Sequence, residues 1–174
     1  MPQTAAILFN PDRVRAVFRI LGSNPSQFPK FDHLASVGCS ILSSPVCLVS
    51  LVSFNKQCFL GASGLPPDLE FSRETPLRDS LCKHAVVARD VIVMNDVHSD
   101  SRVMLTPLLL QKEIRAYLGC PLINKQGICL GSFCAIDHTV RVWTNEEIGL
   151  VRDFALIVVE QFEKLCPRIN PHSN

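Results

Sequence analysis

The sequence is short of several features that would indicate a particular class of protein. Its formal net charge is only +1 over 174 residues, so the composition gives no reason to expect nucleic acid or an anionic membrane as a partner. The longest run without a charged residue, Leu34–Asn55, is interrupted by Gly38 and Pro45 and is therefore not expected to span a membrane. Charged residues interrupt the apolar start of the chain from Asp12 onward, so we expect no signal peptide. A content of 47% hydrophobic and 19% charged residues predicts one globular domain.

The cysteines do not form a zinc-binding pattern, because no two of them are spaced as C-x-x-C. Most lie inside apolar runs, where reduced thiols behave as small hydrophobic side chains. A chain of this size also folds without cross-links. We therefore expect a cytoplasmic protein, with no bound metal, in which the reduced cysteines are Cys39, Cys47, Cys58, Cys82, Cys120, Cys129, Cys134 and Cys166.

What the sequence does contain is a long apolar stretch, Arg115–Asp137. Two apolar runs, Ala116–Ile123 and Ile128–Ile136, are separated by a four-residue Asn-Lys-Gln-Gly turn, which predicts an antiparallel hairpin at the centre of a sheet. Neither run contains a charge, so both faces of the hairpin are expected to be buried. Alternation along the second strand places Ile128, Leu130, Cys134 and Ile136 on one face and Gly131, Phe133 and Ala135 on the other.

Prolines, glycines and capping residues predict the remaining elements. Helices are expected from Asn10-Pro11 to Gly22, from about Asp32 to Ser43, from Thr75-Pro76 onward, and from the capping box Thr144-x-x-Glu147 to Cys166. Strands are expected at Val46–Ser53, Cys58–Ala62 and Val91–Met94, with a loop at Ser63–Glu74 and short helical pieces within Val97–Ile114. This order predicts an α+β fold with an antiparallel sheet. We expect an N-terminal helix and linker over residues 1–30, a domain over 31–166 and a flexible tail over 167–174.

Helix geometry separates two residues that could otherwise act together. On the helix predicted from Thr75, His84 shares one face with Leu77 and Leu81, whereas Cys82 is turned away from His84 by roughly 200°. A Cys-x-His metal or catalytic pair is therefore not expected. With the apolar face turned inward, His84 is either a hydrogen-bonded core histidine or a ligand contact.

The last predicted helix has more apolar surface than one sheet can cover. Its apolar residues span roughly 200° of the helix circumference, against the ~100° that packing on a sheet requires. The surplus predicts a homodimer formed through this helix. The apolar positions are Ile148, Val151, Ala155, Val158, Phe162 and Leu165, with a second stripe at Leu150, Phe154 and Ile157.

Several short motifs occur together in one known family. They are Gly64-Leu65-Pro66, Arg73-Glu74-Thr75-Pro76-Leu77, Ser80-Leu81-Cys82-Lys83-His84, Val93-Met94-Asn95-Asp96-Val97, Asp100-Ser101-Arg102-Val103, Ala116-Tyr117-Leu118-Gly119-Cys120-Pro121-Leu122, Leu130–Asp137 and Val142-Trp143-Thr144. Over roughly residues 12–165 the chain resembles the GAF domain, specifically the bacterial subtype joined to sensor histidine kinases. The most specific part is Leu-Gly-Ser-Phe-Cys-Ala-Ile-Asp with Tyr-x-Gly-x-Pro-Leu upstream.

The resemblance implies a central antiparallel sheet with helices on one face and a ligand pocket on the other, roofed by Val97–Ile114. Members of the family bind cyclic nucleotides, bilins, haem or metabolites and dimerise through terminal helices, so the fold does not fix the ligand or cofactor. The residues expected in the pocket are His84, Asp96, Arg102, Tyr117 and Phe133. Asp96 could equally be a turn residue after a strand, and Tyr117 and Phe133 could be core residues.

Three more specific functions compete with that of a regulatory domain. A bilin photoreceptor usually carries adjacent Cys-His, which Lys83 interrupts here. A free methionine sulfoxide reductase needs a nucleophilic cysteine in the loop before Ala116, and Leu108–Arg115 contains none. A cyclic-nucleotide sensor could use Arg102 or Arg115 for a phosphate, although neither lies in a phosphate-binding motif.

We therefore expect a dimeric, non-catalytic sensory domain in signal transduction. It would bind an unidentified small molecule and act either within a longer protein or on a separate signalling partner, with the thiol enzyme as the main alternative.

Overall fold

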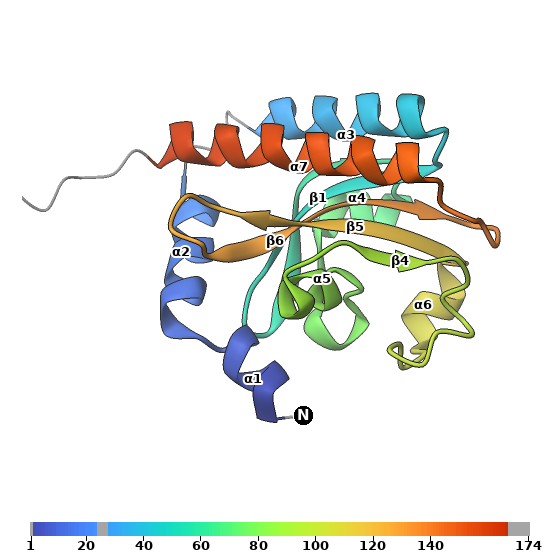
Figure 1. The fold of residues 1–174 in the computed structure, drawn as a ribbon, viewed down its shortest axis with the longest axis horizontal. Coiled ribbons are helices and arrows are strands. Elements are labelled where there is room, and N and C mark those ends of the chain that lie inside the picture. The colour runs from blue at the N-terminus through green and yellow to red at the C-terminus, as the bar shows by residue number, and fades with distance from the viewer. Residues whose placement is uncertain (1, 24–27, 167–174) are drawn as a thin grey trace, which may run out of the picture.

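The computed structural model describes residues 2–23 and 28–166, and its centre is a six-stranded antiparallel sheet (Figure 1). The strand order is β3-β2-β1-β6-β5-β4, so the predicted hairpin forms the adjacent pair β5–β6. The predicted α+β fold with an antiparallel sheet is confirmed. The strands are β1 Val46–Val52, β2 Lys56–Ser63, β3 Glu74–Pro76, β4 Ile92–Met94, β5 Ala116–Ile123 and β6 Cys129–Asp137.

Two long helices, α3 and α7, lie side by side on one face of the sheet, and the short helix α5 packs on the other (Figure 1). Helices are therefore not confined to one face as expected. Helix α1 contacts α5, and α2 contacts β6 near the β5–β6 turn. Within the two described ranges, no helix has both the length and the apolar character needed to cross a lipid bilayer. The helices are α1 Pro2–Leu8, α2 Pro11–Leu21, α3 Phe28–Leu42, α4 Pro67–Ser72, α5 Cys82–Ala88, α6 Pro107–Gln111 and α7 Asn145–Leu165.

Both faces of the central hairpin are buried, as its lack of charge predicts. On the α3–α7 side, Phe133 stacks on Phe154 of α7 with ring centroids 4.8 Å apart and planes 10° from parallel. On the α5 side, Tyr117, Met94 and Val86 belong to a second cluster of fully buried side chains. The sheet is thus enclosed between two apolar layers, which explains why β1 and β6 are almost continuously apolar.

The assignment of Ile128 and Leu130 to the same face of the hairpin as Cys134 and Ile136 was wrong. The pairing register shifts at the end of the hairpin, because Leu122 faces Gly131 whereas the next residue, Ile123, faces Cys129. Leu130 is the extra residue of a β-bulge, which breaks strict alternation. Leu130 and Ile128 therefore pack with Phe133 on the α3–α7 side, whereas Cys134 and Ile136 lie on the α5 side.

The helix expected from Thr75 was also predicted wrongly. Residues Glu74–Pro76 form β3 and pair with β2, and the amide of Leu77 donates to the carbonyl of Asn55 at 3.0 Å. A single 3₁₀ turn follows, and the backbone of Ser80 is extended, so α5 begins only at Cys82. Sheet pairing at the edge thus outweighs the local signal of a cap residue followed by proline.

Two short helices lie where none was predicted. Helix α4 forms within the expected loop Ser63–Glu74, with proline in its first turn and two carboxylates there that favour the positive end of the helix dipole. Helix α1 precedes the helix predicted from Asn10-Pro11, and Asn10 caps α2 by accepting from the amide of Arg13 at 3.0 Å. The expected tail over 167–174 lies outside the described residues.

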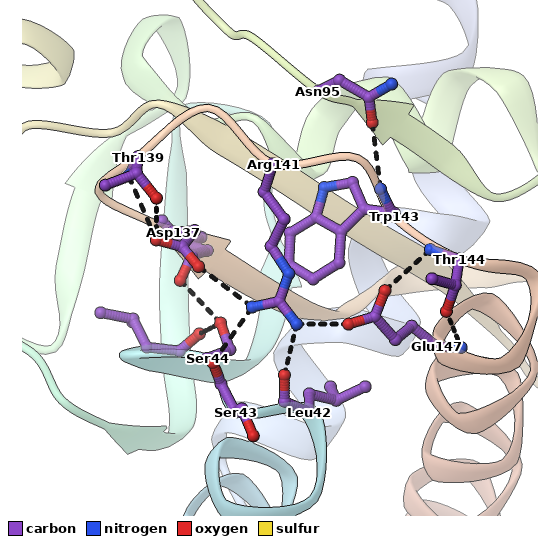
Figure 2. Close-up of polar contacts among 12 residues, drawn as sticks. Leu42, Ser43, Ser44, Asn95, Asp137, Thr139, Arg141, Trp143, Thr144 and Glu147 are labelled. Atoms are coloured by element: carbon purple, nitrogen blue, oxygen red, sulfur yellow. Dashed lines mark hydrogen bonds and ion pairs between the residues drawn. The ribbon is translucent and has the colours of Figure 1, made fainter.

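The start of α7 is held by a network centred on Arg141 (Figure 2). The predicted capping box is confirmed, because Thr144 Oγ1 accepts from the amide of Glu147 and Glu147 accepts from the amide of Thr144. The Arg141 guanidinium donates to Asp137 at 3.0 Å, to Glu147, and to the last carbonyls of α3. It also lies 4.3 Å from the centre of the Trp143 ring. One side chain therefore joins β6, α3 and α7.

Candidate functional site

The candidate site is a cavity of about 770 Å³ between α1 and α5, on the face of the sheet opposite α3 and α7. Most of its wall is apolar, and basic side chains stand among the apolar ones. No carboxylate belongs to its lining among the described residues. The residues that line it are Thr4, Ala5, Leu8, Phe9, Leu77, Arg78, Lys83, His84, Val87, Ala88, Ile92, Arg102 and Met104.

His84 is one of the two predicted site residues that line this cavity, but it is not on the inner face of its helix. The face of α5 toward the sheet carries Cys82, Ala85 and Val86, because the helix starts at Cys82 instead of Thr75. His84 is half-buried on the other side and faces the cavity. Cys82 and His84 therefore lie on different sides of the helix, as predicted. However, Cys82 faces the sheet and His84 faces the cavity, whereas His84 was predicted on the inner face.

The environment of His84 keeps its imidazole neutral at pH 7. Burial lowers the pKa of His84 to about 4, and the nearby positive charges of Lys83 and Arg102 act in the same direction. A neutral imidazole offers one donor and one acceptor to a ligand. His84 is therefore equipped for hydrogen bonding in this cavity, without adding charge.

The positive charge of the cavity comes from the side chains of Arg78, Lys83 and Arg102. Arg102 is held by Asp100 and donates to the carbonyl of Val93 at 2.8 Å, which fixes the predicted site residue at the edge of the cavity. Lys83 Nζ donates to the carbonyls of Leu77 and Arg78 at 3.3 and 2.7 Å, and burial lowers the pKa of Lys83. A mostly apolar wall with basic groups suits a molecule with an apolar body and an acidic group.

The structure does not bring the other three predicted site residues to this cavity. Asp96 pairs with Arg115 at 3.1 Å and accepts from the amide of His98, as a residue of the turn after β4. Tyr117 is completely buried, with its hydroxyl 3.3 Å from Ser132 Oγ. Phe133 lies on the opposite face of the sheet, against α7. It therefore cannot line a pocket together with Tyr117, contrary to the prediction from the sequence.

Sequence reasoning missed the part of the cavity that α1 supplies. Leu8 and Phe9 come from the start of the chain, whereas the facing wall comes from α5, more than 70 positions later. Nothing in the local pattern of either segment indicates that they meet. The exposure of Phe9, which is 53% accessible, indicates this wall of the cavity only once the structure is known.

Two cysteines meet beneath α5. Cys82 Sγ and Cys134 Sγ are 3.7 Å apart, and both side chains are almost fully inaccessible. Burial opposes ionisation of Cys82, but hydrogen bonds from Cys134, Ser132, Ser50 and Tyr117 lower the pKa of Cys82 to about 6. Ionisation is thus favoured at Cys82 alone, because burial and the contact with Cys82 raise the pKa of Cys134, and neither thiol is accessible to a substrate. Within residues 2–23 and 28–166, no cluster of three or more histidine, cysteine or acidic side chains is placed to bind a metal.

Comparison with known proteins identifies the class to which this fold belongs. The GAF domain family matches residues 30–161, and the chain belongs to that family. Over 137 residues it is 30% identical to the cyclic di-GMP phosphodiesterase PA2567 of Pseudomonas aeruginosa. The match covers 78% of this chain and 22% of the phosphodiesterase, so the chain spans about a fifth of that protein's length.

Solved structures share the fold at low sequence identity. A type II free methionine-R-sulfoxide reductase from Thermoplasma acidophilum aligns with a TM-score of 0.64 and 15% identity, over 82% of this chain and 97% of the other. The GAF domain of a phosphoenolpyruvate-protein phosphotransferase from Coxiella burnetii aligns with a TM-score of 0.64 and 16% identity, over 92% and 97%. At these identities the likeness shows the fold alone.

Proposed function

We propose that this chain is a sensory GAF domain that binds a small molecule in the cavity between α1 and α5 and thereby regulates a signalling protein. The observation that carries the proposal is the cavity itself, about 770 Å³ in volume, which falls within the ~300–1,000 Å³ typical of small-molecule sites. The neutral His84 and the anchored Arg102 supply hydrogen bonds at its wall. The ligand class is an apolar molecule with one acidic group.

The proposed signalling context rests on the relatives. The phosphodiesterase of Pseudomonas aeruginosa is much longer than this chain, which matches only 22% of it. A domain of this kind would act on an output domain of the same protein or on a separate partner, either a sensor kinase or an enzyme of cyclic di-GMP turnover. A cytoplasmic location is part of this proposal, because six of the eight free cysteines are buried as thiols.

Dimerisation through α7 is the proposed route by which the domain communicates. Leu156 and Ile157 are 66% and 42% exposed on the outer side of a 21-residue helix. Two copies would bury these side chains against each other. Light scattering during size-exclusion chromatography tests this: we expect Leu156→Glu to convert a dimer to a monomer, and Glu70→Gln on α4, outside the proposed interface, to leave the dimer intact. A wild-type monomer at high protein concentration would contradict it.

Ligand binding is tested with 1-anilinonaphthalene-8-sulfonate, a fluorescent molecule with an apolar body and a sulfonate. We expect saturable binding with one probe per chain. Ala88→Trp, at an exposed position of the cavity wall, should block the probe without disturbing the core, whereas Ser36→Trp on the outer side of α3 should leave binding unchanged. Binding that is equal in the two variants, or absent from the wild type, would overturn the site. Native mass spectrometry of the purified protein then measures the mass of any endogenous ligand.

A thiol-dependent reductase is the second candidate, because the structure resembles a free methionine-R-sulfoxide reductase and holds Cys82 Sγ and Cys134 Sγ 3.7 Å apart. The burial of both thiols argues against turnover. The assay supplies free methionine-R-sulfoxide with a dithiol reductant and compares wild type with Cys82→Ser. Turnover that depends on Cys82 would replace the regulatory proposal with an enzymatic one.

A further inference from the structure

A second cavity, lined by arginines, also borders α1 but shares no lining residue with the first. It has a volume of about 680 Å³ and lies between α1, α2, the turn Gln126–Cys129 and Arg89 at the end of α5. We call it the arginine groove. Its lining contains Arg13, Arg15, Arg19 and Arg89 against a single carboxylate, Asp12.

The buried member of this set, Arg13, has an unusual environment. Only 4% of Arg13 is accessible, and its guanidinium donates to the carbonyls of Ile7, Leu8 and Val52. No carboxylate in the described part of the chain pairs with it. Carbonyl dipoles stabilise a guanidinium but carry no net charge, so a full positive charge lies under the groove without a counter-charge.

A buried charge of this kind acts on the cavity next to it. Water screens it poorly, so its potential extends into the groove that Arg13 lines. Burial lowers the pKa of Arg13, yet a guanidinium remains protonated in proteins. The missing negative charge can come from a ligand that enters the groove.

Two accessible arginines can bind such a ligand directly. The side chain of Arg19 makes no hydrogen bond or ion pair with the described residues. Arg89 uses one donor on the carbonyl of Gly127, at 2.8 Å, which fixes the guanidinium across the groove and leaves its other donors available. Arg15 differs from both because it pairs with Asp12. The available donors are therefore those of Arg19 and Arg89.

We propose that the arginine groove is a binding site for a phosphate-bearing small molecule, held by Arg19 and Arg89 over the buried charge of Arg13. Guanidinium groups bind phosphate oxygens in pairs, which favours phosphate over a single carboxylate. Apolar side chains such as Ile128 and Ala16 line the same groove and can contact the rest of the molecule. The site is separate from the cavity between α1 and α5 and does not depend on the function proposed for that cavity.

The test is isothermal titration calorimetry with inorganic pyrophosphate at constant ionic strength. We expect saturable binding to the wild type, and at least tenfold weaker binding to Arg19→Gln/Arg89→Gln, because each charge-assisted hydrogen bond contributes about 1.5–3 kcal/mol. The control, Lys56→Gln/Arg152→Gln, removes the same charge from exposed positions outside the groove and should bind as the wild type does.

Two outcomes would overturn the proposal. One is the absence of saturable binding to the wild type, and the other is an equal loss of affinity in the two double variants, which would reflect overall charge alone. Because all four substituted side chains are on the surface, circular dichroism can verify that each variant is folded. A parallel titration with adenosine monophosphate and with adenosine extends the test: the nucleotide should bind and the uncharged nucleoside should not. Binding of adenosine as tight as that of the nucleotide would also overturn the proposal.

Discussion

The network around Arg141 allows a quantitative prediction about stability. In Arg141→Met, Asp137 and Glu147 lose their shared partner, and the carbonyls of Leu42 and Ser43 at the end of α3 lose a donor. The methionine side chain keeps much of the apolar contact that the arginine stem makes. The change therefore removes polar interactions more than packing.

The expected cost is about 3 kcal/mol of unfolding free energy. Breaking a buried pair costs about 3–5 kcal/mol. The side chains of Arg141, Asp137 and Glu147 are only 19%, 15% and 17% accessible, so solvent screens the pairs weakly, and we take the low end of that range. At about 2–4 °C per kcal/mol for a domain of this size, the midpoint of thermal unfolding should fall by about 6–12 °C.

A matched control uses an arginine at the surface. Arg152 pairs with Asp90 at 3.7 Å, with 57% and 74% of the two side chains accessible, so Arg152→Met should cost less than about 0.5 kcal/mol. Urea unfolding followed by circular dichroism at 222 nm measures both variants and avoids the change in Trp143 fluorescence that loss of Arg141 would cause. Equal destabilisation by the two substitutions would refute the role assigned to the network.

The destabilisation of Arg141→Met relative to the wild type should also depend on pH. Burial opposes ionisation of Asp137 and Glu147, but hydrogen bonds from backbone amides and from Arg141 outweigh it and hold the pKa of each below its ordinary value. The unfolded state therefore binds more protons in acid, so this contribution is present above the ordinary carboxyl pKa and is lost as pH falls through the folded values. The difference between wild type and Arg141→Met should shrink below about pH 4. A difference that stays constant down to pH 2 would contradict this assignment.

Three further predictions concern single side chains. Gly61→Ala should lower the free energy of unfolding by about 3 kcal/mol, because an added Cβ would lie 2.3 Å from a backbone oxygen of α3. Gly149→Ala, in open space on α7, should raise it by about 0.5–1 kcal/mol. Urea unfolding should therefore give changes of opposite sign for the two variants. Phe133→Ala should cost about 3–5 kcal/mol and Phe71→Ala, which is 94% exposed, almost nothing, and a similar cost for both would contradict the packing. The imidazole of His84 should titrate near pH 4 by NMR, and because its folded pKa is lowered, stability should fall as pH drops from about 6.5 toward 4; a midpoint near 6.5 would show that His84 is not desolvated.

Local patterns in the sequence determined the centre of the fold. The two uncharged apolar runs around Asn124 and Gly127 specified β5 and β6, because turn chemistry and unbroken hydrophobicity act over neighbouring residues. The capping box at Thr144 and Glu147 specified where α7 begins for the same reason. The family itself could be recognised from motifs on these elements.

Tertiary structure decided what those local patterns leave open. Edge pairing with β2 turned the predicted helix start at Thr75 into a strand, and a bulge moved Leu130 to the other face. The later start of α5 turned Cys82 toward the sheet and His84 toward a cavity that α1 helps to enclose. The buried charge of Arg13, which pairs with no carboxylate among the described residues, likewise depends on α2 placing it against the carbonyl of Val52, 39 residues away. Each of these outcomes depends on contacts between distant segments, whose free energy exceeds the small preferences that a local sequence pattern can express.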